Sequence, residues 1–338
     1  MKKLWVISVI GLLSILLFVK CGSNADLKEF KINGMAQGTY YAITYYDDQE
    51  RNLQPEIDSF FKAFDRSASV YLASSIISKV NNNDPEVELD DTFITVFNAA
   101  QKVSARTAGA FDITTMPLTN AWGFGFTDPM KLDSATVDSL LQYVNYRNVS
   151  ITDDRVNKSN PAIKVDFNAI AQGYSADLIG KILEKKGIEN YLVDVGGEVI
   201  AKGRKTDKSS WKVGIEKPAQ EGDETRNIDI IINLENKALA TSGNYRRFFL
   251  KDGIKYSHTI DPSTGFPVSH TLLSASVLAA DCMTADAFAT AFMVMGVEKS
   301  KAFLANNPDL EAHFIYTNQE GKYETWTSEG LQKLISKQ

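Results

Sequence analysis

The sequence predicts an α+β fold, and two observations point to that class. Segments with apolar residues on one helical face are mixed with short strands rich in β-branched and aromatic residues, without the regular strand–helix–strand rhythm of an α/β protein. Of the 338 residues, 44% are hydrophobic and 23% are charged, which is ordinary globular composition and excludes a disordered or collagen-like chain. No linker long enough to divide the chain is present, so residues 30–338 are expected to form one domain.

The first half of this domain is expected to be mainly helical. The pattern predicts two strands within residues 30–46, joined by a glycine-bearing turn, and a hairpin with strands at Asn148–Thr152 and Ala162–Phe167. Apolar residues on one face predict four helices, at Pro55–Tyr71, Thr92–Ala108, Asp133–Tyr146 and Ala176–Lys186.

The second half is expected to contain mostly strands. They are predicted at Tyr191–Val195, Val199–Ala201, Trp211–Ile215, Ile228–Leu234, Phe248–Leu250, Glu311–Tyr316 and Tyr323–Trp326. The polar segment 217–226 is expected to be a surface loop. Two helices are predicted, the very apolar Thr284–Met295 and a second at Lys299–Asn306.

Residues 1–20 are expected to be an export signal rather than part of the fold. Two lysines precede an apolar run from Leu4 to Val19, which is short for a membrane-spanning helix. Cys21 follows, as in bacterial lipoprotein signals whose cysteine is lipidated, although Lys20 stands where a small residue is usual. The alternative is an uncleaved anchor. We expect a lipid anchor at Cys21, a tether over residues 21–29, and a body on the periplasmic side of the inner membrane.

Charge and cysteine content exclude other classes of protein. The net charge is −6 and no basic block occurs, so a nucleic-acid binder is not expected. Cys21 and Cys282 are the two cysteines, too few for a disulfide scaffold, and three histidines leave few ligands for zinc.

Asp286 and Thr290 are candidate metal ligands. They stand four residues apart, on one face of an otherwise apolar predicted helix. A buried carboxylate is costly unless it is paired or binds a metal, and carboxylate and hydroxyl oxygens suit Mg²⁺. The equal alternative is helix capping, with Thr284 as the N-cap and Asp286 in the first turn.

Two further segments carry candidate site residues. His258 stands near the end of a predicted strand that runs into an Asp-Pro turn, where it is either a base or a structural histidine. In the segment 165–177, a strand ends at Asp166 and a helix opens after a turn of small residues, an arrangement that favours phosphate oxygens. The spacing of a dinucleotide fingerprint or a P-loop is absent.

Nine short motifs follow one another along the chain, namely Met35–Thr39, Phe64–Arg66, Ser69–Tyr71, Gly109–Asp112, Asp166 with Ile170–Tyr174, Val195–Gly197, Thr241–Tyr245, His258–Gly265 and Thr284–Ala287. Taken together, these motifs and their order resemble the ApbE family of FAD:protein FMN transferases, which are often periplasmic lipoproteins. The resemblance covers about residues 35–296, and its most specific part is His258–Gly265.

The resemblance implies a fold of mixed or antiparallel sheets flanked by helices, and a Mg²⁺-dependent reaction. FMN would pass from FAD to a Thr or Ser hydroxyl of a target protein, with release of AMP. The implied targets are exported flavoproteins, namely subunits of sodium-pumping NADH:quinone reductases and Rnf-type complexes. The alternatives are a FAD pyrophosphatase, in which water replaces the hydroxyl, and a lipoprotein that binds flavin without turnover.

The resemblance also assigns roles residue by residue. Asp286, Thr290 and the backbone carbonyl of Ala169 match metal ligands, and His258 matches the proposed base. The positions that match contacts to FAD are Met35, Tyr71, Ala110, Phe111, Asp112, Asp166, Gln172 and Ile260. This chain departs from the family pattern at two positions. Gln172 stands where many members have lysine, and Ala289 stands where some have aspartate.

Overall fold

The computed structural model describes residues 27–125, 132–218, 227–244, 248–251 and 254–337. The predicted signal, Cys21 and most of the predicted tether lie outside these residues, as do residues 219–226 of the predicted surface loop. In the described chain, none of the helices combines the length and apolar character needed to cross a membrane.

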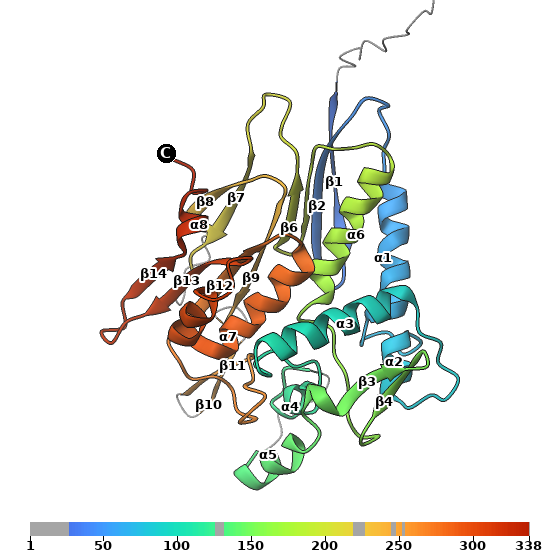
Figure 1. Ribbon diagram of the computed structural model, residues 1–338, viewed down its shortest axis with the longest axis vertical. Coiled ribbons are helices and arrows are strands. Elements are labelled where there is room, and N and C mark those ends of the chain that lie inside the picture. Colours follow the sequence, from blue (N-terminus) through green and yellow to red (C-terminus); the bar gives the residue numbers. More distant parts are fainter. Residues whose placement is uncertain (1–26, 126–131, 219–226, 245–247, 252–253, 338) are drawn as a thin grey trace, which may run out of the picture.

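An antiparallel sheet of eight strands forms the centre of the described fold, in the order β1-β2-β5-β6-β9-β12-β13-β14 (Figure 1). Its neighbours are all antiparallel. The strands are β1 (Lys28–Ala36), β2 (Thr39–Asp47), β5 (Tyr191–Val195), β6 (Glu198–Lys202), β9 (Lys237–Gly243), β12 (Leu272–Ala279), β13 (Glu311–Thr317) and β14 (Tyr323–Thr327).

Three two-stranded ribbons accompany this sheet in the described residues. They are β3 (Val149–Thr152) with β4 (Arg155–Lys158), β7 (Trp211–Glu216) with β8 (Ile228–Leu234), and β10 (Phe248–Lys251) with β11 (Ile254–Ser257). The β7–β8 ribbon packs against the large sheet through an apolar cluster that includes Trp211, Ile215 and Ile232 from the ribbon and Val199 and Leu239 from the sheet.

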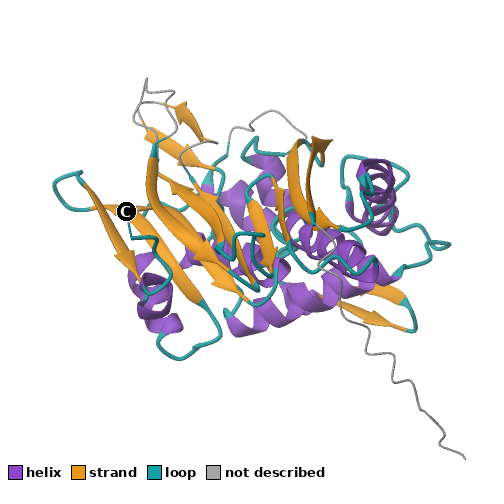
Figure 2. Ribbon diagram, turned by 90° about the horizontal axis from the view of Figure 1, so that it is seen from above, coloured by secondary structure: helices purple, strands orange, loops and turns teal. Residues whose placement is uncertain are grey.

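Viewed from above, most of the helices lie on one side of the large sheet (Figure 2). The helices are α1 (Gln54–Ala68), α2 (Ile76–Asn81), α3 (Asp91–Arg106), α4 (Met116–Ala121), α5 (Ser134–Leu141), α6 (Ala171–Lys185), α7 (Cys282–Leu304) and α8 (Glu329–Gln332). Helices α6 and α7 cross in contact with each other, α6 next to β5 and β6 and α7 next to β9 and β12.

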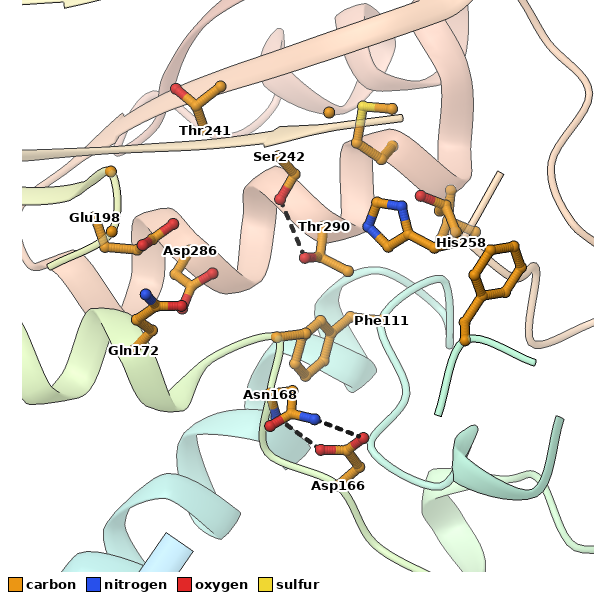
Figure 3. A pocket seen from close by; sticks show the side chains of 18 of the residues that line it. Phe111, Asp166, Asn168, Gln172, Glu198, Thr241, Ser242, His258, Asp286 and Thr290 are labelled. Atoms are coloured by element: carbon orange, nitrogen blue, oxygen red, sulfur yellow. Dashed lines mark hydrogen bonds between the residues drawn. The ribbon is translucent and has the colours of Figure 1, made fainter. Parts of the chain in front are cut away.

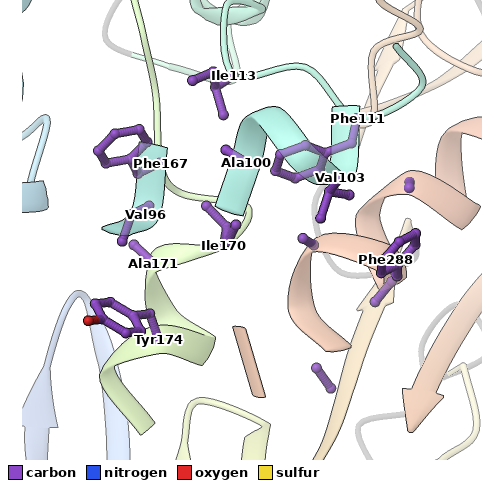
Figure 4. Packing of buried hydrophobic residues seen from close by; sticks show 14 of the residues in the cluster. Val96, Ala100, Val103, Phe111, Ile113, Phe167, Ile170, Ala171, Tyr174 and Phe288 are labelled. Atoms are coloured by element: carbon purple, nitrogen blue, oxygen red, sulfur yellow. The ribbon is translucent and has the colours of Figure 1, made fainter. Parts of the chain in front are cut away.

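The largest apolar core joins α3, the loop before α6, and α7 (Figure 4). Helix α3 contributes buried residues at the three- and four-residue spacing of one helical face, namely Phe93, Val96, Phe97, Ala100 and Val103. They meet Phe111 and Phe167 from loops and Phe288 from α7. This core fixes the loops that carry the predicted site residues against the helix that carries Asp286.

The α+β prediction is confirmed, but several elements differ from expectation. The predicted strand at Ala162–Phe167 is wrong, because Val149–Thr152 pairs instead with Arg155–Lys158 through a tight turn at Asp153 and Asp154, both with positive φ. Residues 162–167 form no strand, and Asn81 bonds the backbone of Val165 there through its side chain.

Other differences concern element limits and central strands. Helix α6 begins at Ala171, five residues before the predicted start, and α5 ends at Leu141 rather than Tyr146. The break predicted between the two helices near the C-terminus is confirmed, because α7 is interrupted between them at Gly296, whose φ is 74°. Helices α2 and α4 and strands β9 and β12 were not predicted, because short apolar or small-residue runs show no periodicity of their own.

Candidate active site

One pocket of about 500 Å³ lies between the ends of β6 and β9 and helices α6 and α7 (Figure 3). Pairing of β6 with β9 ends at Val199 and Leu239, and β9 continues from there to Gly243 along the pocket. All the predicted site residues except Met35 line this pocket, namely Tyr71, Ala110, Phe111, Asp112, Asp166, Ala169, Gln172, His258, Ile260, Asp286 and Thr290.

Met35 is not brought into the pocket. Its residue is 77% exposed, on a strand at the edge of the described sheet. Its partner across the β1–β2 hairpin, Tyr40, lines the pocket instead. The hairpin was predicted, but the sequence pattern did not show which of these two neighbours faces the cavity.

Asp286 is buried in the floor of the site and is held by the first turn of α6. The backbone N–H of Gly173 donates to its Oδ2 at 3.0 Å. Burial raises the pKa of Asp286 to about 7, while this hydrogen bond acts in the opposite direction. Gly173 is required by the geometry, because a Cβ there would lie 2.4 Å from the carbonyl oxygen of Cys282 and 2.8 Å from Cβ of Asp286.

Asp177 makes the reciprocal contact from α6 to α7. Its two carboxylate oxygens accept from the backbone N–H groups of Cys282 and Met283, at 2.8 and 2.9 Å, at the N-terminus of α7. Burial raises the pKa of Asp177 to about 7. Each helix therefore supplies a carboxylate to the N-terminal amides of the other, and these hydrogen bonds help to fix how α6 and α7 cross.

The capping alternative for Thr284 and Asp286 is wrong. The N-cap of α7 is Asp281, whose side chain accepts from the backbone N–H of Thr284 at 2.8 Å. Asp286 lies beyond the first turn and bonds another helix instead. Its placement is therefore not explained by the local needs of α7.

Thr290 lies one turn after Asp286 on the same helix face, and both line the pocket (Figure 3). Its hydroxyl is 3.2 Å from the hydroxyl of Ser242 on β9. The neighbouring Thr241 shares a hydrogen bond of 2.7 Å with Ser276 on β12. The hydroxyl groups of Thr290 on α7 and Ser242 on β9 therefore lie side by side in the lining of the pocket.

Asp166 and Asp112 sit in loops that their own carboxylates stabilise. Asp166 accepts from the backbone and side-chain nitrogens of Asn168 at 2.8 and 3.2 Å (Figure 3). Burial raises its pKa to about 6. Asp112 accepts from the backbone N–H and hydroxyl of Thr114 and from the backbone N–H of Tyr146, and burial raises its pKa as well. Asp112 is therefore largely occupied by its own loop.

His258 follows β11 and lies on the Thr290 side of the pocket (Figure 3). Its ring meets the edge of Phe124 at a centroid distance of 6.3 Å. The Asp-Pro turn after it is closed by a hydrogen bond from the backbone N–H of Gly265 to the carbonyl of Asp261, at 2.8 Å. The predicted position of His258 just after a strand, before a tight turn, is confirmed.

The described lining of the pocket carries acidic side chains but no lysine or arginine. Six carboxylate residues line it, Asp112, Asp166, Asp194, Glu198, Glu216 and Asp286, and no lysine or arginine is among the described lining residues. A phosphate ligand would meet repulsion there unless a cation accompanied it.

No group of three or more His, Cys, Asp and Glu side chains in the described chain is arranged to hold a metal. Asp286 with the Thr290 hydroxyl fits a hard cation that also takes oxygen ligands from a substrate.

Three residues that shape this site were not predicted from the sequence. Gly173 and Asp177 lie in the segment 165–177, for which phosphate binding is predicted, but they contact α7, which is more than 100 residues away. Glu198 is buried and lies beside Asp286 and Gln172 in Figure 3. Its position directly after the Gly196-Gly197 turn was the available signal.

The fold and pocket define an α+β protein with an acidic site that suits a phosphate ligand accompanied by a cation. The sequence model of the ApbE family matches residues 37–314. A FAD:protein FMN transferase of Vibrio cholerae is 33% identical over 340 residues, covering 97% of this chain and 99% of that protein. One of Haemophilus influenzae is 31% identical over 349 residues, with 99% of each covered.

Solved structures agree with this similarity. The flavin transferase ApbE from Vibrio cholerae superposes with a TM-score of 0.81 at 31% identity, covering 91% of this chain and 99% of that one. The ApbE protein from Thermotoga maritima gives 0.79 at 29% identity, covering 92% and 100%. The chain belongs to the ApbE family, as its motifs indicated, and the predicted fold is confirmed.

Proposed function

We propose that this protein transfers FMN from FAD to a Thr or Ser hydroxyl of an acceptor protein and releases AMP. The observation that carries the proposal is the pocket itself, where buried Asp286 and the Thr290 hydroxyl stand among carboxylates without a lysine or arginine in the described lining. A diphosphate enters such a site only together with a cation. The activity named for the similar proteins requires a ligand with that chemistry.

The cation in this proposal is Mg²⁺, held by Asp286, the Thr290 hydroxyl and the backbone carbonyl of Ala169. When bound, Mg²⁺ neutralises charge on the diphosphate and makes the phosphorus more electrophilic. The side chain of Gln172, which donates to the carbonyl of Val195 at 3.3 Å, adds no positive charge where many relatives carry lysine. The site is therefore expected to depend strongly on the added metal.

The chain's own residues position the reacting groups. His258 would accept the proton from the incoming hydroxyl as its oxygen attacks the FMN-side phosphorus. The bond between that phosphorus and the oxygen of AMP then breaks, and the new bond is a phosphoester to the acceptor. Tyr71, Ile260 and the loop 110–112 would hold the flavin or adenine ends of FAD. Because Met35 is exposed, it would contact FAD only at the mouth.

Location and partners extend the proposal. We assign the body to the periplasmic side of the inner membrane, anchored by a lipid on Cys21. The acceptors are exported flavoproteins, among which subunits of NADH:quinone reductases and Rnf-type complexes are the first to examine. Labelling with a palmitate analogue, compared with a Cys21→Ser variant, tests the anchor. An unlabelled wild-type protein would contradict it.

The reaction is tested by mass spectrometry with a pool of eleven-residue peptides, each carrying one central threonine. The protein over residues 22–338 is incubated with FAD and Mg²⁺, with and without EDTA. A gain of one FMN on threonine that EDTA abolishes supports the transferase. FMN and AMP without an adduct would indicate the pyrophosphatase, and bound FAD without products would indicate a storage protein.

The role of His258 is tested by His258→Gln. Transfer is expected to slow by about 100-fold or more, in the range of a lost general base, while FAD affinity stays within twofold. Affinity is measured by the quenching of flavin fluorescence with Mg²⁺ present. A collapse of FAD affinity with an unchanged rate at saturation would make the histidine structural.

A further inference from the structure

The two edges of the β7–β8 ribbon are treated differently by the chain. Residues 334–336 cover the outer edge of β8, because the backbone N–H of Asn233 donates to the carbonyl of Leu334 at 2.8 Å and that of Ser336 to the carbonyl of Ile231 at 2.7 Å. On the other side, no strand in the described part of the chain pairs with the outer edge of β7. Proteins usually cover or block such an edge, because it readily pairs with another strand.

The register shows which groups of β7 are available at that edge. Ile231 and Asn233 direct backbone groups away from β7, toward residues 334–336. Facing residues in an antiparallel pair either exchange both hydrogen bonds or neither. Gly214 faces Ile231 and Lys212 faces Asn233, so the N–H and C=O groups of Gly214 and Lys212 also point away from the ribbon. These groups form a two-residue-spaced ladder at the open edge.

This edge belongs to the wall of the pocket. Val213, Gly214, Ile215 and Glu216 line the same cavity as Asp286 and Thr290. None of the positions assigned to FAD by family resemblance lies on β7; they lie in the β1–β2 hairpin, in the first turn of α6 and in loops elsewhere. Gly214 is exposed and has no side chain to hold another backbone away. The proposed reaction thus leaves β7 without a role, although it borders the site.

We propose that β7 is the docking strand for the acceptor protein, whose segment around the modified hydroxyl binds in extended form along the Lys212 and Gly214 edge. This inference rests on the proposed function, because an acceptor hydroxyl has to reach the pocket that holds the diphosphate. Pairing through main-chain groups is the usual way in which an extended segment adds to a sheet edge. Because such pairing uses main-chain groups, β7 could bind acceptor segments that differ in sequence.

The first test places the change in the acceptor and leaves the enzyme intact. The best acceptor peptide from the threonine pool is N-methylated at one backbone nitrogen at a time, and both its affinity and its rate of FMN transfer are measured. Methylation is expected to weaken binding by about five- to tenfold at every second position, because alternate N–H groups face a paired strand. Uniform tolerance, or a loss without this alternation, would overturn the docking strand.

The second test uses proline at the edge. Gly214→Pro removes an outward N–H without removing a hydrogen bond to β8, and Thr325→Pro is the matched control on β14, the far edge of the large sheet. We expect Gly214→Pro to raise the KM for the acceptor peptide by about five- to tenfold with FAD affinity within twofold, and the control to change neither. An equal loss of FAD affinity would assign β7 to FAD and contradict the proposal.

Direct binding separates this inference from the proposed function. Alternating sensitivity of peptide affinity with no FMN adduct would support docking and contradict the transferase. An FMN adduct that forms at equal rates on all methylated peptides would support the transferase and contradict docking on β7. Sedimentation identifies a different occupant: a wild-type dimer that Gly214→Pro dissociates, with peptide binding unchanged, would assign the edge to a second copy and overturn the proposal.

Discussion

The α6–α7 crossing and the β7–β8 ribbon border the same pocket but satisfy their backbone groups in opposite ways. At the crossing, Asp177 takes two N-terminal amides of α7, and Asp286 takes the amide of Gly173 in α6. In the ribbon, the edge of β8 is covered by residues 334–336, while no strand among the described residues pairs with the edge of β7 beside the pocket.

This difference indicates that the helix crossing is a fixed part of the site, whereas the β7 edge suits a partner that binds and dissociates. A carboxylate that has to hold a cation needs a set position, and buried hydrogen bonds between helices provide it. An edge that receives a changing partner needs free main-chain groups and no obstructing side chain. The four experiments below test this comparison, from the largest expected effect to the smallest.

Asp286→Asn is expected to have the largest effect. The amide keeps the shape and retains an oxygen for the Gly173 N–H, but it loses the negative charge that attracts a cation. FMN transfer is expected to fall by more than about 100-fold, beyond the 10- to 100-fold typical of residues that only support a metal ligand. The Mg²⁺ dependence of FAD affinity, followed by calorimetry, should also disappear. Normal Mg²⁺ dependence in this variant would contradict the proposal that Asp286 is a metal ligand.

Gly173→Ala tests the closeness of the helix crossing. Alanine favours a helix by about 1 kcal/mol over glycine, but here its methyl group would overlap the carbonyl of Cys282. We expect the free energy of unfolding to fall by about 1–3 kcal/mol, as in overpacked cores, and transfer to fall with it. Chemical denaturation and a transfer assay measure the two effects. A variant as stable as the wild type would mean that the helices can separate freely.

Truncation after Lys333 tests the covered edge of the ribbon. It removes Leu334–Ser336 and their hydrogen bonds to β8, so stability is expected to fall by about 1–3 kcal/mol and self-association to increase. Denaturation and light scattering measure these changes. Truncation after Ser336 is the matched control and should behave as wild type. Equal behaviour of both truncations would show that the C-terminal segment does not protect this edge.

The smallest expected effect concerns the link between the ribbon and the large sheet. His313 of β13 is buried, with its Nε2 3.0 Å from Asp229 of β8 and its Nδ1 2.8 Å from the Thr327 hydroxyl. Burial lowers the pKa of His313, although Asp229 opposes this shift. The unfolded chain therefore binds the proton more readily than the folded protein does. The stability contributed by neutral His313 is complete above the unfolded pKa of about 6.5 and is lost as the pH falls below it.

The measurement is the free energy of unfolding between pH 7.5 and 5. This histidine should contribute a decline of at most about 1.4 kcal/mol per pH unit as the pH is lowered. His313→Gln should show a shallower decline than the wild type. An identical pH dependence in both proteins would mean that His313 does not titrate on unfolding in this range.

Local patterns predicted the parts of the fold whose periodicity is strong. The β1–β2 hairpin, α1 and α3 alternate or repeat clearly, and each lies within a few residues of its predicted range. Strand β9 was missed, because its small residues between β6 and β12 show no alternation. The strand predicted at Ala162–Phe167 failed because its apolar residues fill a core shared with α3 rather than pair with Asn148–Thr152.

The same division holds for the site. Asp286 and Thr290 could be placed on one helix face from their spacing, and the motifs with their family resemblance gave the other predicted site residues, all of which line the pocket except Met35. The contacts of Gly173 and Asp177 could not be predicted, since each depends on α7, over 100 residues later in the chain.

By itself, then, the sequence determined the family, the fold class and eleven of the residues that line the pocket, because composition, periodicity and motif order are properties of short segments. Tertiary structure decided which oxygen holds which amide across the α6–α7 crossing, and that Tyr40 rather than Met35 faces the cavity. It also decided that β7 borders the site with an edge that no strand of the described chain pairs with. These features depend on how distant segments pack, and local preferences do not encode that packing separately.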